Sequence, residues 1–572
     1  MRQIVMSTGT AALKRNIVLI VLAAVICLGA CSGQGGGQYE IPDDTSQPGP
    51  SETASQSSAS GTEKPVKGGT LRLSVGPFDT VNPLLTNNAD VVTFSWLLCE
   101  PLVKLSPTME PLPCVFSEWT HNKDLTVWEF KVDTGISFHD GKAVTAEDAK
   151  RVIDFIIDKG GNYAGNVEGV AACFARSGDT VQFVLKAPDG LFPVKLMMPL
   201  VGWQTLAADI PAEISGTGIF VQESFDKERI MLRKNENYRD PGALTNFDAV
   251  EISVFPDEDS KLRSDYDIAF VYGTSIGTTI LSDDSYVCYF AGNTYDYVAL
   301  NCSSTYFMSS TEVTPDGGTV KNYVSFDNPF QDPDVRMAAN LVTSRANALH
   351  TAASDKGVIS LLPALSGTIY RRQNTEDYAY NTDRAELLLE KAGYSKNYDD
   401  GKWYSAEGEE LIIRGLAPKN NFRMVRTLRE AAEGLRKIGV TVELYEVSDE
   451  DYLEGLRNKE FSMAAMEIEL SFWPDLSAVL KTDGELNYSY YSNTLVDAYI
   501  GQAETLEDPE VVVAAYNEIE KLLLEDNPII GMYVVQNAAV FKSELRGVLR
   551  EQFFPQDILG AVSEWWIKRS PY

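Results

Sequence analysis

Among the side chains that could carry out catalysis, histidines are few and carboxylates are many. The 572 residues include three histidines, His121, His139 and His350, which is little material for a histidine-rich metal site or a histidine-based triad. Acidic side chains number 81, against 49 basic ones, so some pair will lie about 5–10 Å apart by chance, the spacing of glycosidase carboxylates. The abundance of carboxylates alone therefore does not indicate an enzyme.

Three acidic residues lie close enough in the sequence to suggest a metal site, namely Asp140, Glu147 and Asp148. Asp140 belongs to an Asp-Gly turn, and Thr-Ala-Glu-Asp at residues 145–148 is typical of a capping box that opens a helix. Because turn and capping roles account for all three carboxylates, we predict no metal site. We likewise predict no cofactor.

The amino terminus predicts export. Three basic residues precede an apolar run at residues 17–28, which is too short to span a bilayer comfortably but has the length of a signal-peptide core. The run ends in Leu-Gly-Ala-Cys, which resembles the bacterial lipobox. That resemblance implies that residues 1–30 are a signal peptide and that lipid is attached to Cys31. A plain transmembrane anchor is the alternative.

The next segment, residues 31–67, is dominated by Gly, Ser, Thr, Gln and Pro and shows no apolar periodicity. Such a composition cannot bury enough apolar surface to offset its ordering entropy, so we predict a flexible tether. The formal net charge of the chain is −32. This argues against nucleic acid as a partner, because phosphate binding needs clustered Lys and Arg.

Five cysteines remain after cleavage and lipidation: Cys99, Cys114, Cys173, Cys288 and Cys302. The number is odd, so at least one thiol is unpaired or forms an intermolecular bond. Cys288 and Cys302 flank an apparent hairpin at residues 287–301, with Gly-Asn-Thr as its turn, and are one plausible pair. Buried free cysteine is the expectation for the others.

Hydrophobic periodicity divides the folded part into two kinds of architecture. Period-two runs typical of strands come first, at residues 70–75, 125–132, 180–186, 229–233 and 250–254. Later, a strand–helix–strand unit typical of a parallel sheet occupies residues 411–416, 421–437 and 440–447. A further strand is expected at 461–468, and helices at 334–350, 382–392, 449–458, 494–505 and 509–525. We therefore expect at least two lobes.

The folded part contains a series of short motifs whose order along the chain is specific to one protein family, although no single motif is decisive. They include Gly-Gly-Thr-Leu-Arg at 68–72, Asn-Pro-Leu at 82–84, Glu-Pro-Leu-Val at 100–103, Phe-His-Asp-Gly-Lys at 138–142, Leu-Arg-Lys-Asn-Glu-Asn-Tyr at 232–238 and Ala-Gly-Tyr at 392–394. From residue 68 to residue 572 this order resembles the substrate-binding lipoproteins of bacterial ABC importers. The matching branch is the family 5 extracellular solute-binding proteins, with oligopeptide-, dipeptide- and nickel-binding members.

The resemblance implies an α/β fold of the two-lobed periplasmic-binding-protein type (type II), with an extra domain inserted in the first lobe. The division we expect is first lobe at 68–104, inserted domain at 105–214, first lobe again at 215–296, second lobe at 297–538 and a return to the first lobe at 539–572. Members of the family are not enzymes. They enclose a solute between the lobes by a hinge motion.

In peptide-binding members the ligand lies extended and pairs through its backbone, as in strand addition. By position in the family pattern, residues 86–90 of the first lobe face residues 472–475 of the second. We expect ligand contacts from Asn87, Asn88, Glu469, Trp473, Asp475 and Tyr490. Tyr490 belongs to a tyrosine-rich run that fits a cleft wall and a packed sheet surface equally well.

One departure from the family pattern bears on the ligand. Peptide-binding relatives place an aspartate, which pairs with the peptide ammonium group, at the position that is Leu470 here. Either Glu467, Glu469 or Asp475 supplies that salt bridge, or the ligand has no free amino terminus, because a buried cation without a partner is very costly.

The function we predict is that of a monomeric receptor, lipid-anchored outside the cytoplasmic membrane, that delivers an oligopeptide or other small solute to ABC permease subunits. An oligosaccharide is the alternative ligand. Nickel held by protein nitrogen ligands is disfavoured by the scarcity of histidine, whereas a chelated metal carried as the solute stays open. A surface-anchored cell-wall hydrolase is the remaining alternative. The sequence leaves the ligand, the permease and the type of cell envelope open.

Overall fold

The computed structural model describes residues 64–86, 88–106, 110–207, 213–226, 228–273, 284–313, 319–363, 379–471, 473, 475–506, 508–548 and 555–568. The predicted signal peptide, Cys31 and residues 32–63 of the predicted tether lie outside the described residues. So do Asn87, Phe472 and Pro474. Among the helices that are described, none is long and apolar enough to cross a bilayer.

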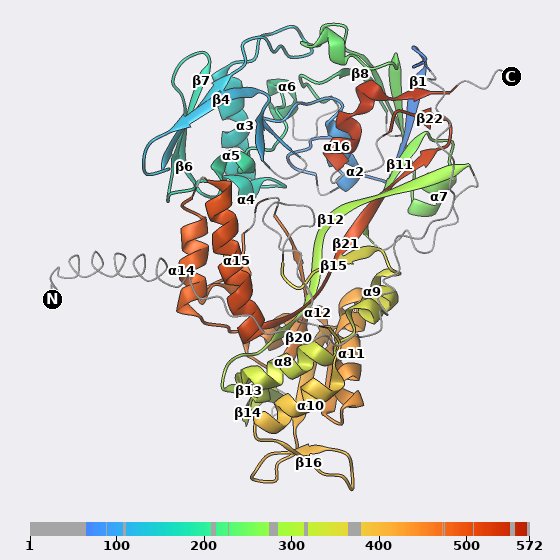
Figure 1. Cartoon of the computed structure of the whole chain (residues 1–572). Helices are drawn as coiled ribbons and strands as arrows, with labels where there is room; N and C mark the ends of the chain where they lie inside the picture. Colours follow the sequence, from blue (N-terminus) through green and yellow to red (C-terminus); the bar gives the residue numbers. More distant parts are fainter. Residues whose placement is uncertain are drawn as a thin grey trace, which may run out of the picture. The chain divides into compact units, whose positions relative to one another are not determined.

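One mixed sheet connects strands from most of the described chain (Figure 1). Its strand order is β19-β18-β20-β12-β21-β11-β1-β10-β9-β8, with β15 paired to β21. The bounds are β1 (Thr70–Val75), β8 (Phe220–Phe225), β9 (Arg229–Lys234), β10 (Ala249–Val254), β11 (Ile268–Val271), β12 (Ser285–Leu300), β15 (Gly357–Ile359), β18 (Ile412–Pro418), β19 (Thr441–Val447), β20 (Met463–Glu469) and β21 (Ile529–Lys542).

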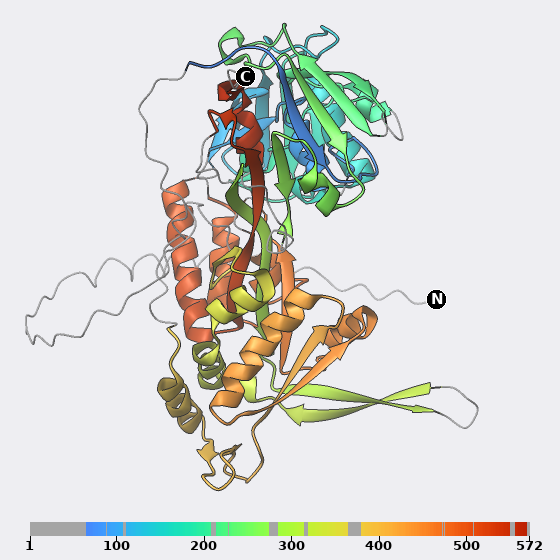
Figure 2. The same cartoon turned by 90° about the vertical axis from the view of Figure 1, so that its right-hand side faces the viewer.

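Strands β12 and β21 run antiparallel along most of their length (Figure 2). Residues 285–291 of β12 pair with 536–542 of β21, residues 295–296 pair with 533–534, and residues 297–299 pair with 529–531 after a one-residue shift. A register shift at residues 292–294 separates the first of these ladders from the others. Gly292 fits there because a Cβ would lie 2.3 Å from the carbonyl oxygen of Val535. Such a bulge bends a strand without ending it.

Strands β12 and β21 cross between two large hydrophobic cores, and a third, smaller cluster includes Ala538 and Val540 of β21. The first core consists of buried residues between Leu71 and Phe290 and, after a long excursion of the chain, between Ala539 and Trp565. The second core consists of buried residues between Tyr295 and Val535. Each of the two crossing strands therefore contributes one end to each core.

A separate antiparallel sheet, β4-β5-β7-β6, packs into the first core. Beside it lies α3, which begins at the predicted capping box between Thr145 and Asp148. The bounds are β4 (Phe116–His121), β5 (Val127–Val132), β6 (Val170–Ala175), β7 (Thr180–Leu185), α3 (Ala146–Lys159), α4 (Ala164–Val167), α5 (Phe192–Lys195) and α6 (Trp203–Ala207). The remaining elements here are β2 (Val103–Leu105), β3 (Pro111–Pro113), α2 (Ala89–Ser95), α7 (Glu258–Arg263), α16 (Pro555–Gly560), β22 (Leu545–Arg546) and β23 (Trp566–Ile567).

The predicted strand–helix–strand unit is confirmed in the second core. β18 and β19 pair in parallel, and α11 (Phe422–Lys437) between them is capped by Asn421, whose side chain accepts from the Met424 amide. The other helices are α8 (Pro333–Val342), α9 (Arg345–Ala353), α10 (Thr382–Lys391), α12 (Asp449–Arg457), α13 (Ser477–Leu480), α14 (Thr494–Ala503) and α15 (Pro509–Asp526). Two hairpins complete the region: β13 (Thr305–Val313) with β14 (Thr319–Asp327), and β16 (Ser395–Lys396) with β17 (Trp403–Tyr404).

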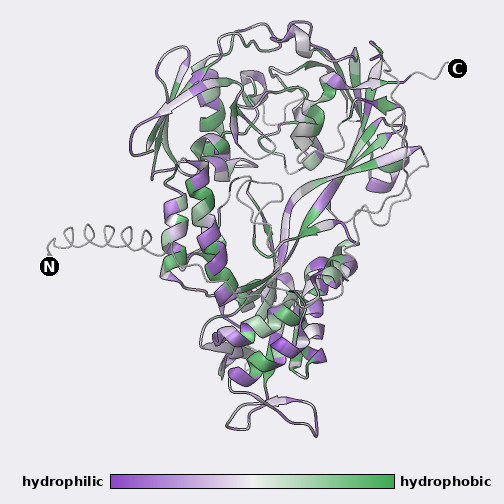
Figure 3. Ribbon diagram, in the orientation of Figure 1, coloured by the Kyte–Doolittle hydropathy of each residue, from purple (hydrophilic) through white to green (hydrophobic). Residues whose placement is uncertain are grey.

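Helix α15 shows why these helices form where the periodicity predicts. It buries Val512, Ala515, Ile519 and Leu523 in the second core, a spacing of three to four residues that places apolar side chains on one face. Its hydrophobic and hydrophilic residues alternate along the ribbon accordingly (Figure 3).

The expected hairpin at residues 287–301 is wrong. The Gly-Asn-Thr segment is the bulge of one continuous strand, β12, so Cys288 and Cys302 lie about 45 Å apart along extended chain. A disulfide needs Cα atoms about 4.4–6.8 Å apart. All five cysteines of the described chain are free thiols.

The single helix expected at residues 334–350 is two helices. α8 ends at Thr343, whose hydroxyl bonds back to the Ala339 carbonyl, and Ser344 caps the start of α9. Hydroxyl side chains that bond the backbone locally compete with helix continuation, and this pair of residues turns the chain.

Helix α11 packs against α8 through Gly434, where a Cβ would lie 2.0 Å from the Val342 carbonyl oxygen. We expect Gly434→Ala to lower the free energy of unfolding by about 2–4 kcal/mol, because the two backbones must separate. Gly501→Ala in α14 is the matched control, since nothing lies within 4 Å of its Cβ position, and it should stabilise by about 0.5–1 kcal/mol. Urea denaturation measures both changes, and equal effects of the two substitutions would contradict close packing of α11 on α8 at Gly434.

Candidate functional site

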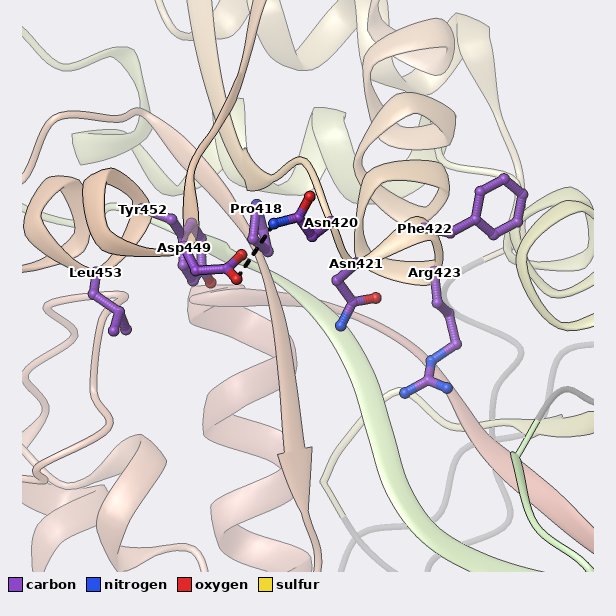
Figure 4. A pocket seen from close by; sticks show the side chains of 8 residues that line it. All are labelled: Pro418, Asn420, Asn421, Phe422, Arg423, Asp449, Tyr452 and Leu453. Atoms are coloured by element: carbon purple, nitrogen blue, oxygen red, sulfur yellow. Dashed lines mark hydrogen bonds between the residues drawn. The ribbon is translucent and has the colours of Figure 1, made fainter. Parts of the chain in front are cut away.

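An open pocket of about 590 Å³ lies at the carboxyl end of β18, where the first turns of α11 and α12 meet (Figure 4). Its lining is Pro418, Asn420, Asn421, Phe422, Arg423, Asp449, Tyr452 and Leu453. Phe422 is 59% exposed and Leu453 is 44% exposed, although both are large and apolar. Ligands of open α/β sheets bind outside the carboxyl ends of the strands, so this edge of the second core is the candidate site.

A cluster of three charges lies beside the pocket. Arg423, in the first turn of α11, pairs with Asp296 of β12 at 2.8 Å and also with Glu467 of β20. Asp296 and Glu467 stand directly opposite each other in the ladder, which is unfavourable for two like charges. The guanidinium of Arg423 bridges them and so holds the start of α11 onto the crossing strand.

Asp296 is the most deeply placed member of this cluster. Its side chain is wholly buried, and its Oδ1 has no hydrogen-bond partner among the described residues. Burial raises the pKa of this carboxyl from its ordinary 3.8 to about 7, with Glu467 adding to the rise and Arg423 opposing it. The proton-bound form is therefore populated near neutral pH.

The asparagine predicted at the lip of the first lobe serves a local role. Asn88 is the N-cap of α2: its side chain accepts from the amides of Asp90 and Val91, and its Nδ2 donates to the Pro77 carbonyl at 2.7 Å. These bonds use most of its capacity, so a ligand contact from this side chain remains a prediction. Asn87 lies outside the described residues.

Three of the predicted residues follow one another at the carboxyl end of β20. Glu469 is exposed and pairs across the sheet with Thr294 of the bulge. Trp473 is partly buried, with the Lys195 ammonium 5.3 Å from its ring centroid. Asp475 accepts from the amide of Ser477 at 3.0 Å, one turn of chain before α13. These three residues share one edge of the second core.

Tyr490 lies at the other end of β20. Its ring is 6.5 Å from that of Phe461, its hydroxyl donates to the Leu456 carbonyl at 2.6 Å, and Lys459 lies over the ring. Phe461 lies eight residues before Glu469, so the ring of Tyr490 packs about 26 Å along the chain from Glu469. The packed-surface interpretation of the tyrosine run accounts for all these contacts, and we leave Tyr490 out of the candidate site.

Leu470 is buried, and its amide donates to the Asn293 carbonyl at 2.7 Å. A side chain in this position offers a ligand no charge. The pocket residues and Asp296 were not predicted from the sequence. The available signal was the capped helix start after β18, because helix starts at the carboxyl ends of parallel strands border the crevice.

The catalytic alternatives find little support in the site. The sequence contains a Gly-Thr-Ser-Ile-Gly run at residues 273–277, the spacing of a nucleophile elbow. Only Gly273 of this run is described; it follows β11, and its amide donates to the Asn537 side chain at 2.9 Å. Across the described residues, no group of three or more His, Cys, Asp and Glu side chains is arranged to hold a metal ion.

Comparison with known proteins decides between the classes. The family described as bacterial extracellular solute-binding proteins, family 5 (middle), matches residues 110–488, well over half of the chain. This chain belongs to family 5 of the extracellular solute-binding proteins. The solute-binding protein is thus a non-enzymatic receptor of an ABC importer, from a family that works outside the cytoplasm.

The family 5 protein is 23% identical to the oligopeptide-binding protein AppA of Bacillus subtilis (strain 168), over 98% of this chain and 99% of AppA. Its fold matches the structure of B. subtilis AppA in complex with a nonapeptide at a TM-score of 0.59, with 20% identity over 88% of this chain and 100% of that one. It matches the unliganded open form of the murein tripeptide-binding protein MppA at 0.72, with 18% identity over 89% and 98%. The predicted α/β fold with an extra domain is confirmed.

The raised pKa of Asp296 predicts that the free energy of unfolding depends on pH. Because the folded chain holds this proton up to about pH 7 and the unfolded chain releases it near 3.8, the stabilisation is present at low pH and is lost as the pH rises through 7. Relative to Asp296→Asn, the wild-type free energy of unfolding should fall by up to about 4 kcal/mol between about pH 4 and pH 8. Urea denaturation at several pH values measures this difference, and a pH-independent difference would contradict it.

Proposed function

We propose that this solute-binding protein is a lipid-anchored receptor that captures an oligopeptide between two lobes and delivers it to the permease of an ABC importer. The observation that carries the proposal is full-length similarity to an oligopeptide-binding protein. Fold similarity to structures described as holding a nonapeptide and as binding a murein tripeptide supports the same class of ligand.

The arrangement of the cores supports capture between lobes. We take residues 105–214 as the inserted domain, 68–104, 215–296 and 539–572 as the rest of the first lobe, and 297–538 as the second lobe. The crossing strands β12 and β21 then form the hinge, with the bulge at residues 292–294 as its bending point. A hinge of few residues between two rigid cores is the usual design for closure around a ligand.

A peptide ligand needs an acid for its ammonium group, and Leu470 does not supply one. Glu467 is already held by Arg423 and by the Asn421 side chain. Glu469 is exposed at the end of β20, and its carboxylate makes no ion pair within the described chain. We therefore assign the ammonium group to Glu469.

An oligosaccharide remains the second candidate ligand, and Leu470 is the residue that favours it. A sugar carries no ammonium group, so a site without the usual aspartate would suit it. The rings at this edge, exposed Phe422 and partly buried Trp473, would then stack on the sugar faces. The peptide proposal is preferred because charged groups outnumber aromatic rings around the pocket.

The assignment of Glu469 predicts a selective loss. Glu469→Gln should weaken binding of a penta-alanine peptide with a free amino terminus by about tenfold or more, because a charge-assisted bond is lost. The amino-acetylated peptide should bind equally to both forms, and Glu485→Gln, at an exposed turn, should change neither. Calorimetric titration of lipid-free protein measures both. Heat from oligosaccharides and from no peptide would overturn peptide capture.

The proposed lipid anchor predicts that replacing Cys31 moves the protein out of the membrane fraction. Cys31→Ser removes the sulfur that would carry the lipid, so the mutant expressed in a bacterial host should leave the membrane pellet and appear in the soluble fraction or medium. Ser32→Ala, next to the same site, should stay with the membrane. Retention of the Cys31→Ser chain in the pellet after a carbonate wash would mean that an uncleaved segment spans the membrane.

A further inference from the structure

A short segment of the first core touches the second core at Trp473. The Gly190 amide donates to the backbone oxygen of Glu504, at the end of α14, at 3.1 Å. Five residues later, the Lys195 ammonium at the end of α5 lies 5.3 Å from the Trp473 ring centroid. Residues about 280 positions apart in the sequence are therefore brought into contact by the fold.

The Lys195 ammonium is held in place from its own side. It pairs with Asp189 at 2.7 Å, both side chains are largely buried (22% and 17% exposed), and Asp189 also accepts from the Leu191 amide at 3.0 Å. Charges from both cores meet here: burial raises the pKa of Glu504, Asp475 and Asp189 raise it further, and Lys481 and Lys195 oppose the rise. The cation over Trp473 is thus a fixed feature of the contact.

The indole N–H of Trp473 is buried and has no acceptor within the described part of the chain. Leaving a buried donor unpaired destabilises the folded chain. Trp403 shows what a purely structural tryptophan looks like in this molecule. It also has a lysine over its ring, Lys396 at 5.5 Å, but it is 1% exposed and its indole N–H donates to the Ile438 carbonyl at 2.8 Å.

Trp565 has an unpaired indole N–H as well. It is wholly buried in the first core, against Phe541, where a solute cannot reach it. Trp473 differs because it is partly exposed and sits where one core meets the other. Separation of that contact would uncover its N–H, which makes it a group that an incoming solute can satisfy.

We propose that the Trp473 indole N–H donates a hydrogen bond to a carbonyl or carboxylate oxygen of the bound solute, and that Lys195, held by Asp189, is the residue that positions the ring. The inference rests on the proposed function, since it names a further contact of the same site. An extended peptide presents a backbone carbonyl at every residue. One fixed donor therefore serves peptides of any sequence.

Trp473→Phe tests the donor, because it keeps an aromatic ring and removes the N–H. Binding of tri-, penta- and nona-alanine, measured by calorimetry, should weaken about fivefold to tenfold. Trp203→Phe, at a tryptophan that is 62% exposed in α6, should leave the affinity unchanged. In protein labelled with ¹⁵N at the tryptophan indoles, the resonance missing from Trp473→Phe should move downfield when peptide is added to the wild type.

Lys195→Met tests the positioning role. It should shift the Trp473 indole resonance in the absence of peptide and weaken peptide binding severalfold. Lys195→Arg should restore both, because arginine keeps the ion pair and the cation over the ring. Lys396→Met, at the structural pair, should leave peptide affinity unchanged.

The outcomes separate this inference from the proposed function. Peptide binding by the wild type, together with unchanged affinity in Trp473→Phe and an unmoved indole resonance, overturns the inference and leaves peptide capture standing. If no peptide produces heat with the wild type, peptide capture fails and the inference fails with it.

Discussion

The antiparallel ladder between β12 and β21 is the constraint on which the rest of the molecule depends. Both strands bury residues in both cores, so the same pair of strands carries the connection between them. The ladder is interrupted by the bulge at residues 292–294, opposite Val535. A strand resists stretching but bends readily at a bulge. Motion between the cores can therefore occur here while each core keeps its own packing.

The charge cluster of Arg423, Asp296 and Glu467 follows from this position. Asp296 is the second residue after the bulge within the paired ladder, and it stands opposite Glu467 of β20. Replacing such a cluster by apolar residues often costs nothing in stability, whereas removing one member is costly. Its effect here is geometric: it ties the first turn of α11, which borders the pocket, to the strand that crosses between the cores. A solute held at that pocket is held close to the bending point.

Local features were predictable from the sequence because local chemistry determines them. The capping box at Thr145, the parallel unit around α11 and the strand at 70–75 all rest on periodicity and on side chains a few residues apart. The bulge was mistaken for a hairpin turn because Gly-Asn-Thr suits either, and only pairing with a strand more than 200 residues away distinguishes them. Contacts such as that of Lys195 with Trp473 leave no periodic signal. The prediction that Trp473 contacts the ligand came from the family resemblance alone.

The unpaired indole N–H of Trp473, where the two cores meet, bears on how the protein selects its solute. Since the cost of burying the Trp473 N–H is already present in the chain without solute, any solute that brings an acceptor relieves it, and a solute of equal size without one does not. Sites with a buried polar group reject ligands that leave that group unpaired far more strongly than apolar pockets reject a missing methylene. The lipophilic walls of the pocket, Phe422 and Leu453, can then remain permissive toward side chains. Trp473 thus discriminates between classes of solute, whereas Phe422 and Leu453, at the same edge, tolerate different members of one class.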